Sequence, residues 1–328
     1  MNTHITAILL LLLNSGFALF SAVPGEVVIW GTTSQGESWF AKSLEIAGKP
    51  ITNAIAVSAG RNHALILKTG GSVVAWGYNQ YGQTNLPAEL ADVVQVEAGN
   101  FFSLALDKTG RVSAWGNTRI TSRDLEDIIS ISVGCRALAL KRDRRVFSWS
   151  GHGGFVSGLT NIVAIASGGC DDELNLALRN DGTLVAWGRG EVPAGLSNVT
   201  AIAVGEYHSL ALKSDGTVYG WGDNHCEQAT GIKNPEGQRN ASGLVMHSGQ
   251  VLSNVVAIAA GNQYGMFGLV SHHSLALKKD GTVVGWGRIC GQPVSVPEGL
   301  SNVVAISAGQ TFCMAITTNA AVAERFRH

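Results

Sequence analysis

Two stretches of this chain have nearly the same sequence: SLALKSDGTVYGWGDN at residues 209–224 and SLALKKDGTVVGWGRI at residues 274–289. A tryptophan recurs along the chain at positions 30, 76, 115, 149, 187, 221 and 286, and all but Trp149 are followed by glycine. Apart from one gap of 65 residues, the spacings of 34 to 46 residues are near the roughly 40-residue period of propeller blades. The chain is therefore built from copies of one structural unit.

Each copy has the same internal order. An apolar run such as VVAIAAG (255–261) precedes a short variable loop, the sequence HSLAL, an Asp-Gly pair and the sequence TVVGWG. The runs are short, β-branched and bounded by glycine, which predicts buried strands. The Asp-Gly pairs at 181–182, 215–216 and 280–281 predict tight hairpin turns with positive φ angles. One such unit cannot bury both faces of its sheet, so we expect the tryptophans to pack between neighbouring sheets.

The copies close into a ring. Six complete units run from the apolar stretch to the tryptophan, at residues 55–76, 93–115, 129–149, 163–187, 199–221 and 255–286. Two fragments remain: VVIWG at 27–31 and VVAISAGQTFCMAI at 303–316. Together they make a seventh unit. The sequence therefore predicts an all-β, seven-bladed β-propeller closed by pairing of the N-terminal strand with the C-terminal strands.

These repeats resemble those of the regulator of chromosome condensation family, over almost all of residues 26–317. The resemblance implies a seven-bladed β-propeller, and the founding member implies guanine-nucleotide exchange on a small GTPase. The sequences WGYNQYGQTNLPAEL (76–90) and VPAGLSNV (192–199) are similar to secreted bacterial members such as beta-lactamase inhibitory protein II, a precedent for a secreted binder. The third unit departs most, because KRDRRV (141–146) replaces the Asp-Gly turn.

The composition excludes some classes of function. The chain has 328 residues, 45% hydrophobic and 14% charged, with a net charge of −1, so it has no basic field to hold nucleic acid or an anionic membrane. The five cysteines form no CxxC pair, which argues against zinc and thioredoxin-like chemistry. Either Cys135 with Cys170, or Cys226 with Cys290, bridges neighbouring units, or these cysteines are free.

The N-terminal residues MNTHITAILLLLLNSGFALFSA predict a secretory signal peptide region at 1–22, cleaved near Ala18. An uncleaved anchor and a buried first strand are the alternatives. Residues 26–317 then form the propeller, with insertions at 223–253 and 262–271, and residues 318–328 form a C-terminal tail. We expect a monomer, secreted or held in the cell envelope or periplasm, with no membrane span after cleavage of the signal.

Candidate binding residues lie in the variable loop between the first apolar run and the HSLAL segment, which recurs on one face of the ring. Loops on a rigid scaffold carry function, and aromatic side chains anchor interfaces. We expect the aromatic and methionine side chains in these loops to form one rim: Phe101, Tyr207, Tyr264, Met266 and Phe267. The alternative is that they plug the channel. Asp171, Asp172 and Glu173 form an acidic loop that binds calcium or a basic partner, or that is merely solvated. The insertion at 223–253, with His225 and Cys226, should emerge at another part of its blade as a mobile flap or small partner site.

No catalytic constellation stands out, so we expect no enzyme activity, cofactor or metal site. His63, His208 and His273 share a repeat position that holds Phe102 and Phe312 elsewhere, which favours packing or bridging roles. The leading hypothesis is a secreted, non-catalytic module that binds a protein partner. The alternatives are a regulator of a small GTPase that acts as a guanine-nucleotide exchange factor, and an inhibitor of a secreted enzyme such as a β-lactamase.

Overall fold

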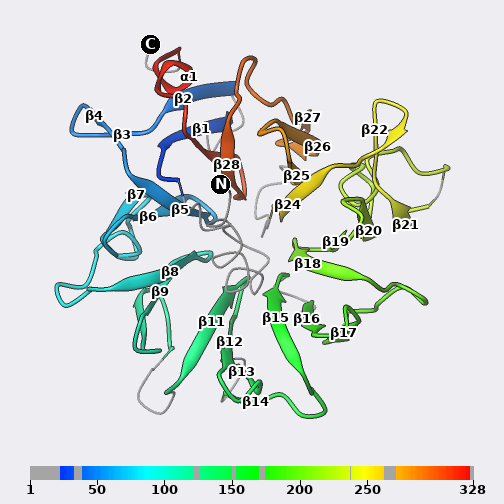
Figure 1. The fold of residues 1–328 in the computed structure, drawn as a ribbon, viewed down its shortest axis with the longest axis horizontal. Coiled ribbons are helices and arrows are strands. Elements are labelled where there is room, and N and C mark those ends of the chain that lie inside the picture. The colour runs from blue at the N-terminus through cyan, green and yellow to red at the C-terminus, as the bar shows by residue number, and fades with distance from the viewer. Residues whose placement is uncertain are drawn as a thin grey trace, which may run out of the picture.

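The structure is a computed structural model that describes residues 23–32, 39–120, 126–149, 153–169, 174–188, 190–236, 238–261 and 271–325. Seven antiparallel sheets are arranged radially around a centre, as the blades of a propeller (Figure 1). The first strand of each repeat lies innermost. The predicted all-β, seven-bladed fold is confirmed.

Blades 1 to 3 follow in chain order. Blade 1 contains β5 (Ala54–Ala59), β6 (His63–Lys68) and β7 (Val73–Gly77). Blade 2 contains β8 (Val93–Ala98), β9 (Phe102–Asp107) and β10 (Val112–Gly116). Blade 3 contains β11 (Ile128–Val133), β12 (Ala137–Lys141), β13 (Val146–Ser148) and β14 (Gly154–Phe155).

Blades 4 to 6 repeat the pattern. Blade 4 contains β15 (Ile162–Ser167), β16 (Asn175–Arg179) and β17 (Leu184–Trp187). Blade 5 contains β18 (Val199–Val204), β19 (His208–Lys213), β20 (Val218–Asp223) and β21 (Asn240–Leu244). Blade 6 contains β24 (Val255–Ala260), β25 (His272–Lys278), β26 (Val283–Ile289) and β27 (Gln292–Pro293).

Blade 7 joins the two ends of the chain and closes the ring. Its strands are β28 (Val303–Ala308), β29 (Phe312–Thr317), β1 (Glu26–Thr32) and β2 (Trp39–Ser43). β1 pairs antiparallel with β29 from Glu26 opposite Thr317 to Gly31 opposite Phe312. The predicted closure by the N-terminal strand is therefore confirmed.

Smaller elements decorate the ring. Two hairpins, β3 (Glu45–Ile46) with β4 (Lys49–Pro50) and β22 (Met246–His247) with β23 (Gln250–Val251), lie outside the blades. The helix α1 (Ala320–Arg325) follows β29 and contacts β1 and β2. None of the described helices is long and apolar enough to cross a membrane.

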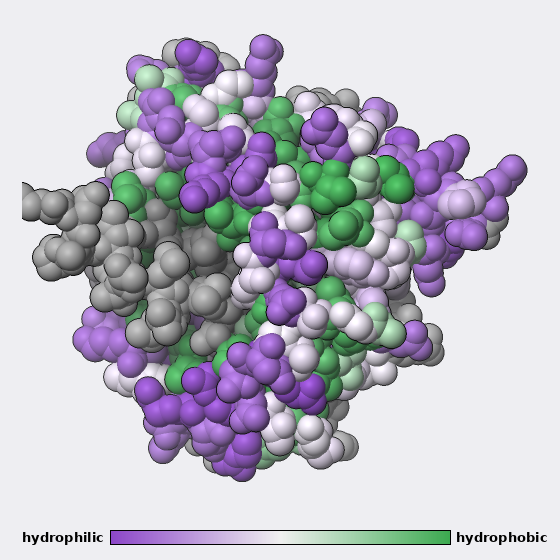
Figure 2. Space-filling model, turned by 45° about the vertical axis from the view of Figure 1, so that its right-hand side comes forward, coloured by the Kyte–Doolittle hydropathy of each residue, from purple (hydrophilic) through white to green (hydrophobic). Residues whose placement is uncertain are grey.

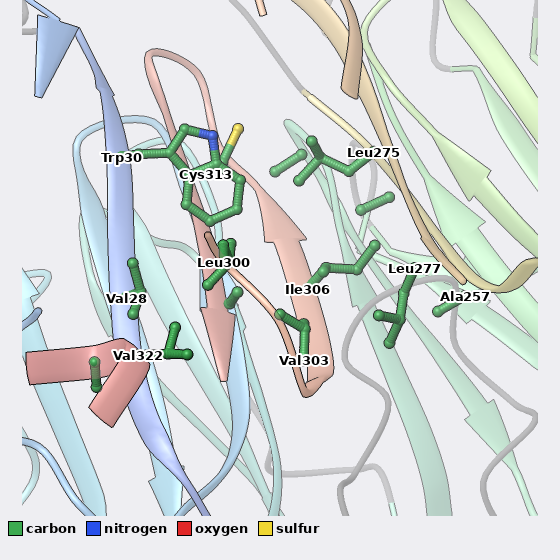
Figure 3. Close-up of a cluster of buried hydrophobic side chains, with 14 of the residues drawn as sticks. Val28, Trp30, Ala257, Leu275, Leu277, Leu300, Val303, Ile306, Cys313 and Val322 are labelled. Carbon is green, nitrogen blue, oxygen red and sulfur yellow. The ribbon is translucent and has the colours of Figure 1, made fainter. Parts of the chain in front are cut away.

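The core lies between the blades. The described residues form seven hydrophobic clusters, one at each junction between neighbouring blades. Successive side chains of a strand point to opposite faces, so Ala64 and Ile66 pack toward blade 7 while Leu65 and Leu67 pack toward blade 2. Figure 3 shows the cluster of blades 6 and 7, with Trp30 of β1 facing Leu275 of the neighbouring blade. The expected wedging of tryptophans between sheets is thus observed.

An asparagine or aspartate in the left-handed conformation precedes the inner strand of every blade. These residues, with φ between 52° and 59°, are Asn53, Asp92, Asp127, Asn161, Asn198, Asn254 and Asn302. The backbone carbonyl of each accepts a hydrogen bond from the turn that follows the second strand of the same blade; for example, Ser214 N donates to Asn198 O at 2.9 Å. Asn and Asp tolerate this conformation better than most residues. This hydrogen bond therefore ties the start of the first strand of each blade to the end of its second strand.

The hairpin turns differ from the prediction in one respect. Gly216 has a φ of 79°, but Asp215 is not among the residues with positive φ. Instead, its carboxylate accepts hydrogen bonds from the backbone N–H and the hydroxyl of Thr217, at 2.9 and 2.6 Å. The turn is thus a type I turn followed by a left-handed glycine, the usual three-residue hairpin loop, and not a two-residue turn.

Candidate interaction surface

One face of the ring collects two sets of loops from each blade. The second strand of a blade runs antiparallel to the first and third, so the residues after each Trp-Gly pair return to the loop that joins the first two strands. Tyr78 N donates to Asn62 O at 2.8 Å, and Asp223 N donates to Tyr207 O at 2.8 Å. We call this side the loop face.

An aromatic cluster spans blades 1 and 2 on the loop face. The ring centroid of Tyr81 lies 5.0 Å from that of Phe101 and 6.4 Å from that of Tyr78. The guanidinium of Arg61 stacks on Phe101, 4.8 Å from the ring centroid. Tyr78 and Tyr81 remain 42% and 46% exposed. We call these four residues the Tyr81 cluster; they are large side chains already ordered by contact with one another.

A second, more polar group lies on the loop face at blades 5 and 6. The ring of His272 lies 5.7 Å from that of Tyr207 and 5.1 Å from that of His225. Asp223 accepts hydrogen bonds from His225 Nδ1 at 2.6 Å and from Arg239 at 2.7 Å. These five residues form the Asp223 cluster.

Burial and hydrogen bonding set the charges of the Asp223 cluster. Burial alone would raise the pKa of Asp223, but hydrogen bonds from the backbone and ring of His225 and from Arg239 hold that pKa below its usual value. Burial lowers the pKa of His272 to about 4, with a further contribution from the nearby His225. At neutral pH this cluster therefore combines an ionised carboxylate with a neutral, buried imidazole.

A cavity of about 880 Å³ opens between blades 4 and 5 beside Tyr207. Blade 5 contributes Glu206, Ser209 and Trp221, and blade 4 contributes Leu174 and the segment 190–194. On the side drawn in Figure 2, hydrophobic residues form separate patches between hydrophilic ones.

The rim predicted from the sequence is only partly described. Phe101 and Tyr207 both lie on the loop face, in blades 2 and 5, which are not neighbours; each has its own ring partners. Tyr264, Met266 and Phe267, like Asp171, Asp172 and Glu173, lie outside the described residues. Their roles stay predictions.

The sequence did not single out Tyr78, Tyr81 and Arg61. Tyr78 and Tyr81 lie in the segment that follows Trp76, and the antiparallel third strand β7 brings that segment back to the loop face. The same geometry corrects the expectation for the insertion at 223–253. Its first residues lie beside Tyr207, at the loop face and not elsewhere, and the remainder contains the outer strand β21 and the hairpin of β22 and β23.

The repeated histidines bridge neighbouring blades. His63 Nε2 lies 2.9 Å from Ser103 Oγ, and His208 Nε2 lies 2.8 Å from Ser274 Oγ. His273 Nε2 lies 3.3 Å from Cys313 Sγ. Burial lowers the pKa of His63 to about 4 and that of His208 to about 3, so both rings are neutral.

The cysteines and carboxylates give no sign of a metal site in the described part of the chain, where no group of three or more His, Cys, Asp or Glu side chains is arranged to hold an ion. Cys226 and Cys290 are free thiols, so they do not bridge two units, and Cys313 is also free. Cys135 is disulfide-bonded, and Cys170 lies outside the described residues.

Comparisons with known proteins agree with the repeat. The family model described as "Regulator of chromosome condensation (RCC1) repeat" matches residues 54–83, 93–119 and 199–228. No curated protein matches the chain by sequence.

Solved structures share the fold over most of the chain. Prp20p from Saccharomyces cerevisiae, described with its binding to Gsp1p and histones, is 19% identical with a TM-score of 0.68, over 94% of this chain and 95% of Prp20p. The same yeast protein bound to Kap60 gives 20% identity and a TM-score of 0.68, over 99% and 96%. The CRINKLY ectodomain of the Arabidopsis thaliana receptor kinase ACR4 is 20% identical with a TM-score of 0.57, over 83% and 94%. The chain is thus a seven-bladed β-propeller that contains repeats of the regulator of chromosome condensation type.

Proposed function

We propose that this protein is an exported, non-catalytic interaction module that binds a protein partner through the Tyr81 cluster. The observation that carries the proposal is the pair of half-exposed tyrosines, Tyr78 and Tyr81, held against Phe101 and Arg61. Tyr and Arg are the residue types that dominate binding energy at interfaces. Their mutual contacts reduce the side-chain entropy that is lost on binding.

Three further observations support the proposal. The apolar N-terminal run predicts export. Among the similar folds, one is the ectodomain of a plant receptor kinase, and the yeast relatives were solved with, or described as binding, protein partners. Mass spectrometry of the N-terminus tests export: a mature chain that starts near residue 19 supports it, and an intact Met1 in a soluble pool contradicts it.

Binding is tested with the immobilised full chain and material from the host's culture medium and envelope. The Tyr78→Ala/Tyr81→Ala variant should lose the bound partner. Phe155→Ala is the matched control, because Phe155 is also 46% exposed and carries the guanidinium of Arg145 at 4.3 Å, but lies on the outer strand of blade 3. Equal retention by both variants would contradict the role of the cluster.

Two alternative functions are tested with purified proteins. The first is nucleotide exchange, which the resemblance of the repeats to the regulator of chromosome condensation family implies; it predicts faster release of labelled GDP from a small GTPase when the chain is added. The exposed tyrosines also suit inhibition of a secreted enzyme, so a serine β-lactamase serves as a defined probe. Either activity would replace the general proposal with a specific one.

A further inference from the structure

A repeated hydrogen-bond relay links neighbouring blades just below the loop face. Between blades 1 and 2, Ser103 Oγ donates to the backbone carbonyl of Gln83 at 2.7 Å and lies 2.9 Å from His63 Nε2. The indole of Trp115 donates to the same carbonyl at 2.9 Å. The serine hydroxyl thus has two partners, an imidazole and a carbonyl, from the preceding blade.

Blades 5 and 6 repeat this relay with different residues. Ser274 Oγ donates to Gln228 O at 2.9 Å and lies 2.8 Å from His208 Nε2. Trp286 Nε1 donates to Gln228 O, also at 2.9 Å. In both cases the accepting carbonyl belongs to the loop that follows the tryptophan of the preceding blade, and that loop fills the space above the serine.

Ser209 of blade 5 occupies the position that Ser103 and Ser274 occupy in their blades. It makes neither the hydrogen bond to a histidine nor the one to a loop carbonyl. It pairs with Trp221 across the sheet as Ser103 pairs with Trp115. In blade 4, Leu174 takes the position that His63 takes in blade 1. Leu174 directly precedes the residue that pairs with Trp187, and His63 directly precedes the residue that pairs with Trp76. The Ser209 side chain is 1% exposed, and its hydroxyl has no hydrogen-bond partner among the described residues.

The second partner is missing because the loop of blade 4 is shorter. Pro87 follows Trp76 by 11 positions, whereas Pro193 follows Trp187 by only 6, a difference of five residues. The shortened loop still provides a hydrogen-bond acceptor for the tryptophan of the next blade, because Glu191 O accepts a hydrogen bond from Trp221 Nε1 at 2.7 Å. No described residue of this loop accepts a hydrogen bond from Ser209. The cavity of about 880 Å³ lies at this place and is lined by Leu174, Ser209 and Trp221.

The size and lining of the cavity restrict its occupant. Its volume is within the roughly 300–1,000 Å³ of ordinary ligand sites. The carboxylates of Glu191, Glu206 and Asp223 line it together with Arg239, and Asp223 is already paired with that arginine at 2.7 Å. The rest of the lining includes the polar residues Ser209, Asn240 and Ser242, which favours an occupant that offers hydrogen-bonding groups.

We propose that this cavity is a binding site for a peptide turn of a protein partner, which takes the place of the five missing loop residues and accepts a hydrogen bond from Ser209 through a backbone carbonyl. The equivalent space in two other blade pairs is filled by a peptide loop of the chain itself, with a carbonyl bonded to the matching serine. A turn with polar, uncharged side chains matches the lining. This site does not depend on the Tyr81 cluster.

The probe is the heptapeptide NQYGQTN, the sequence of residues 79–85, capped at both ends and titrated into the full chain by calorimetry or NMR. We expect saturable binding at one site. Ser209→Ala should weaken binding about five-fold, the worth of one neutral hydrogen bond. Ser103→Ala is the matched control and should leave binding unchanged, because the hydroxyl of Ser103 is already bonded within its own blade pair.

A loop-restored variant, in which residues 188–191 are replaced by the sequence of residues 77–85, should fill the cavity and abolish peptide binding. The Tyr78→Ala/Tyr81→Ala variant should bind the peptide like the parent, which separates this site from the proposed partner surface. The proposal is overturned if the parent shows no saturable binding, or if Ser209→Ala binds as tightly as Ser103→Ala. Should the loop-restored chain fail to fold, the comparison of the two serine variants decides.

Discussion

The imidazole of His63 and the hydroxyl of Ser103 meet across two blades at 2.9 Å, and His208 and Ser274 meet in the same way at 2.8 Å. Leu174 and Ser209 stand at the matching positions of blades 4 and 5 and make no such bond. A serine of the same repeat position is therefore satisfied in two blade pairs and unsatisfied in a third.

This contrast predicts opposite effects of one substitution. Ser103→Ala and Ser274→Ala should each lower the free energy of unfolding by about 1–3 kcal/mol, because each leaves the Nε2 atom of a buried histidine without its hydrogen bond. Ser209→Ala should be neutral or raise it by up to about 1 kcal/mol, since it removes a buried hydroxyl without a partner. Urea unfolding of the three variants measures the difference, and a loss for Ser209→Ala as large as for the others would contradict the assignment.

The tryptophans give a second matched pair. Trp286 Nε1 donates to Gln228 O at 2.9 Å, whereas Trp30 Nε1 is buried with no hydrogen-bond partner within the described residues. Trp30→Phe should therefore cost about 1 kcal/mol less than Trp286→Phe. Trp30→Ala should cost about 3–5 kcal/mol, because it opens a large cavity in the cluster that joins the closing strand to blade 6. Thermal and urea unfolding test both statements; a larger cost for Trp30→Phe than for Trp286→Phe would count against them.

The turn of blade 3 predicts a stabilising substitution. Arg144 has a φ of 70° and takes the place that Gly216 takes in blade 5, while Asp143 Oδ1 accepts from Arg145 N at 3.1 Å. A left-handed conformation costs a non-glycine residue roughly 1–2 kcal/mol. Arg144→Gly should thus raise the free energy of unfolding by up to about 1 kcal/mol, after the entropy cost of glycine. Gly216→Ala is the reverse control and should lower the melting temperature; no change in either variant would refute the reasoning.

Glu97 predicts how stability depends on pH. Of the seven inner strands, all described, only β8 carries a charged residue type, and there Glu97 is 1% exposed. Burial raises its pKa from 4.5 to about 8, although Gln95 and Ser58 donate hydrogen bonds to the carboxyl. The stability that this protonated carboxyl confers is complete below pH 4.5. It is lost as the pH rises toward 8, because the unfolded chain ionises first.

The test compares the parent with Glu97→Gln between pH 4.5 and 8. The variant keeps a neutral side chain of the same shape, so its urea midpoint should fall less than that of the parent as the pH rises. Parallel curves for the two proteins would show that Glu97 does not titrate in this range.

Much of the fold could be predicted because the repeat occurs in six complete copies and two half-copies along the sequence. The short apolar runs, the spacing of the tryptophans and the two half-units at the ends predicted the blades and the closure. The turn conformation was missed because Asp-Gly suits two kinds of hairpin, and only the hydrogen bonds of Asp215 to Thr217 distinguish them. The left-handed Asn and Asp residues were visible in the sequence as a recurring residue before each apolar run, but their role depends on a carbonyl that the sequence does not display.

The candidate sites were harder to predict. The loop position of Phe101 and Tyr207 follows from the order of the repeat, whereas Tyr78 and Tyr81 required the direction of the third strand. The cavity lies where the loop after Trp187 is five residues shorter than the loop after Trp76. That difference becomes meaningful only when the partners of Ser103 and Ser274 are known in three dimensions.

The pairing of β1 with β29 also orders events during biosynthesis. β1 leaves the ribosome before every other described strand, yet its main partner is the last strand to be made. Until β29 emerges, β1 can pair only with β2, and the contact that closes the ring spans nearly the whole chain. Contacts of such sequence separation form slowly. A nascent chain would therefore remain an open row of blades until β29 arrives to pair with β1.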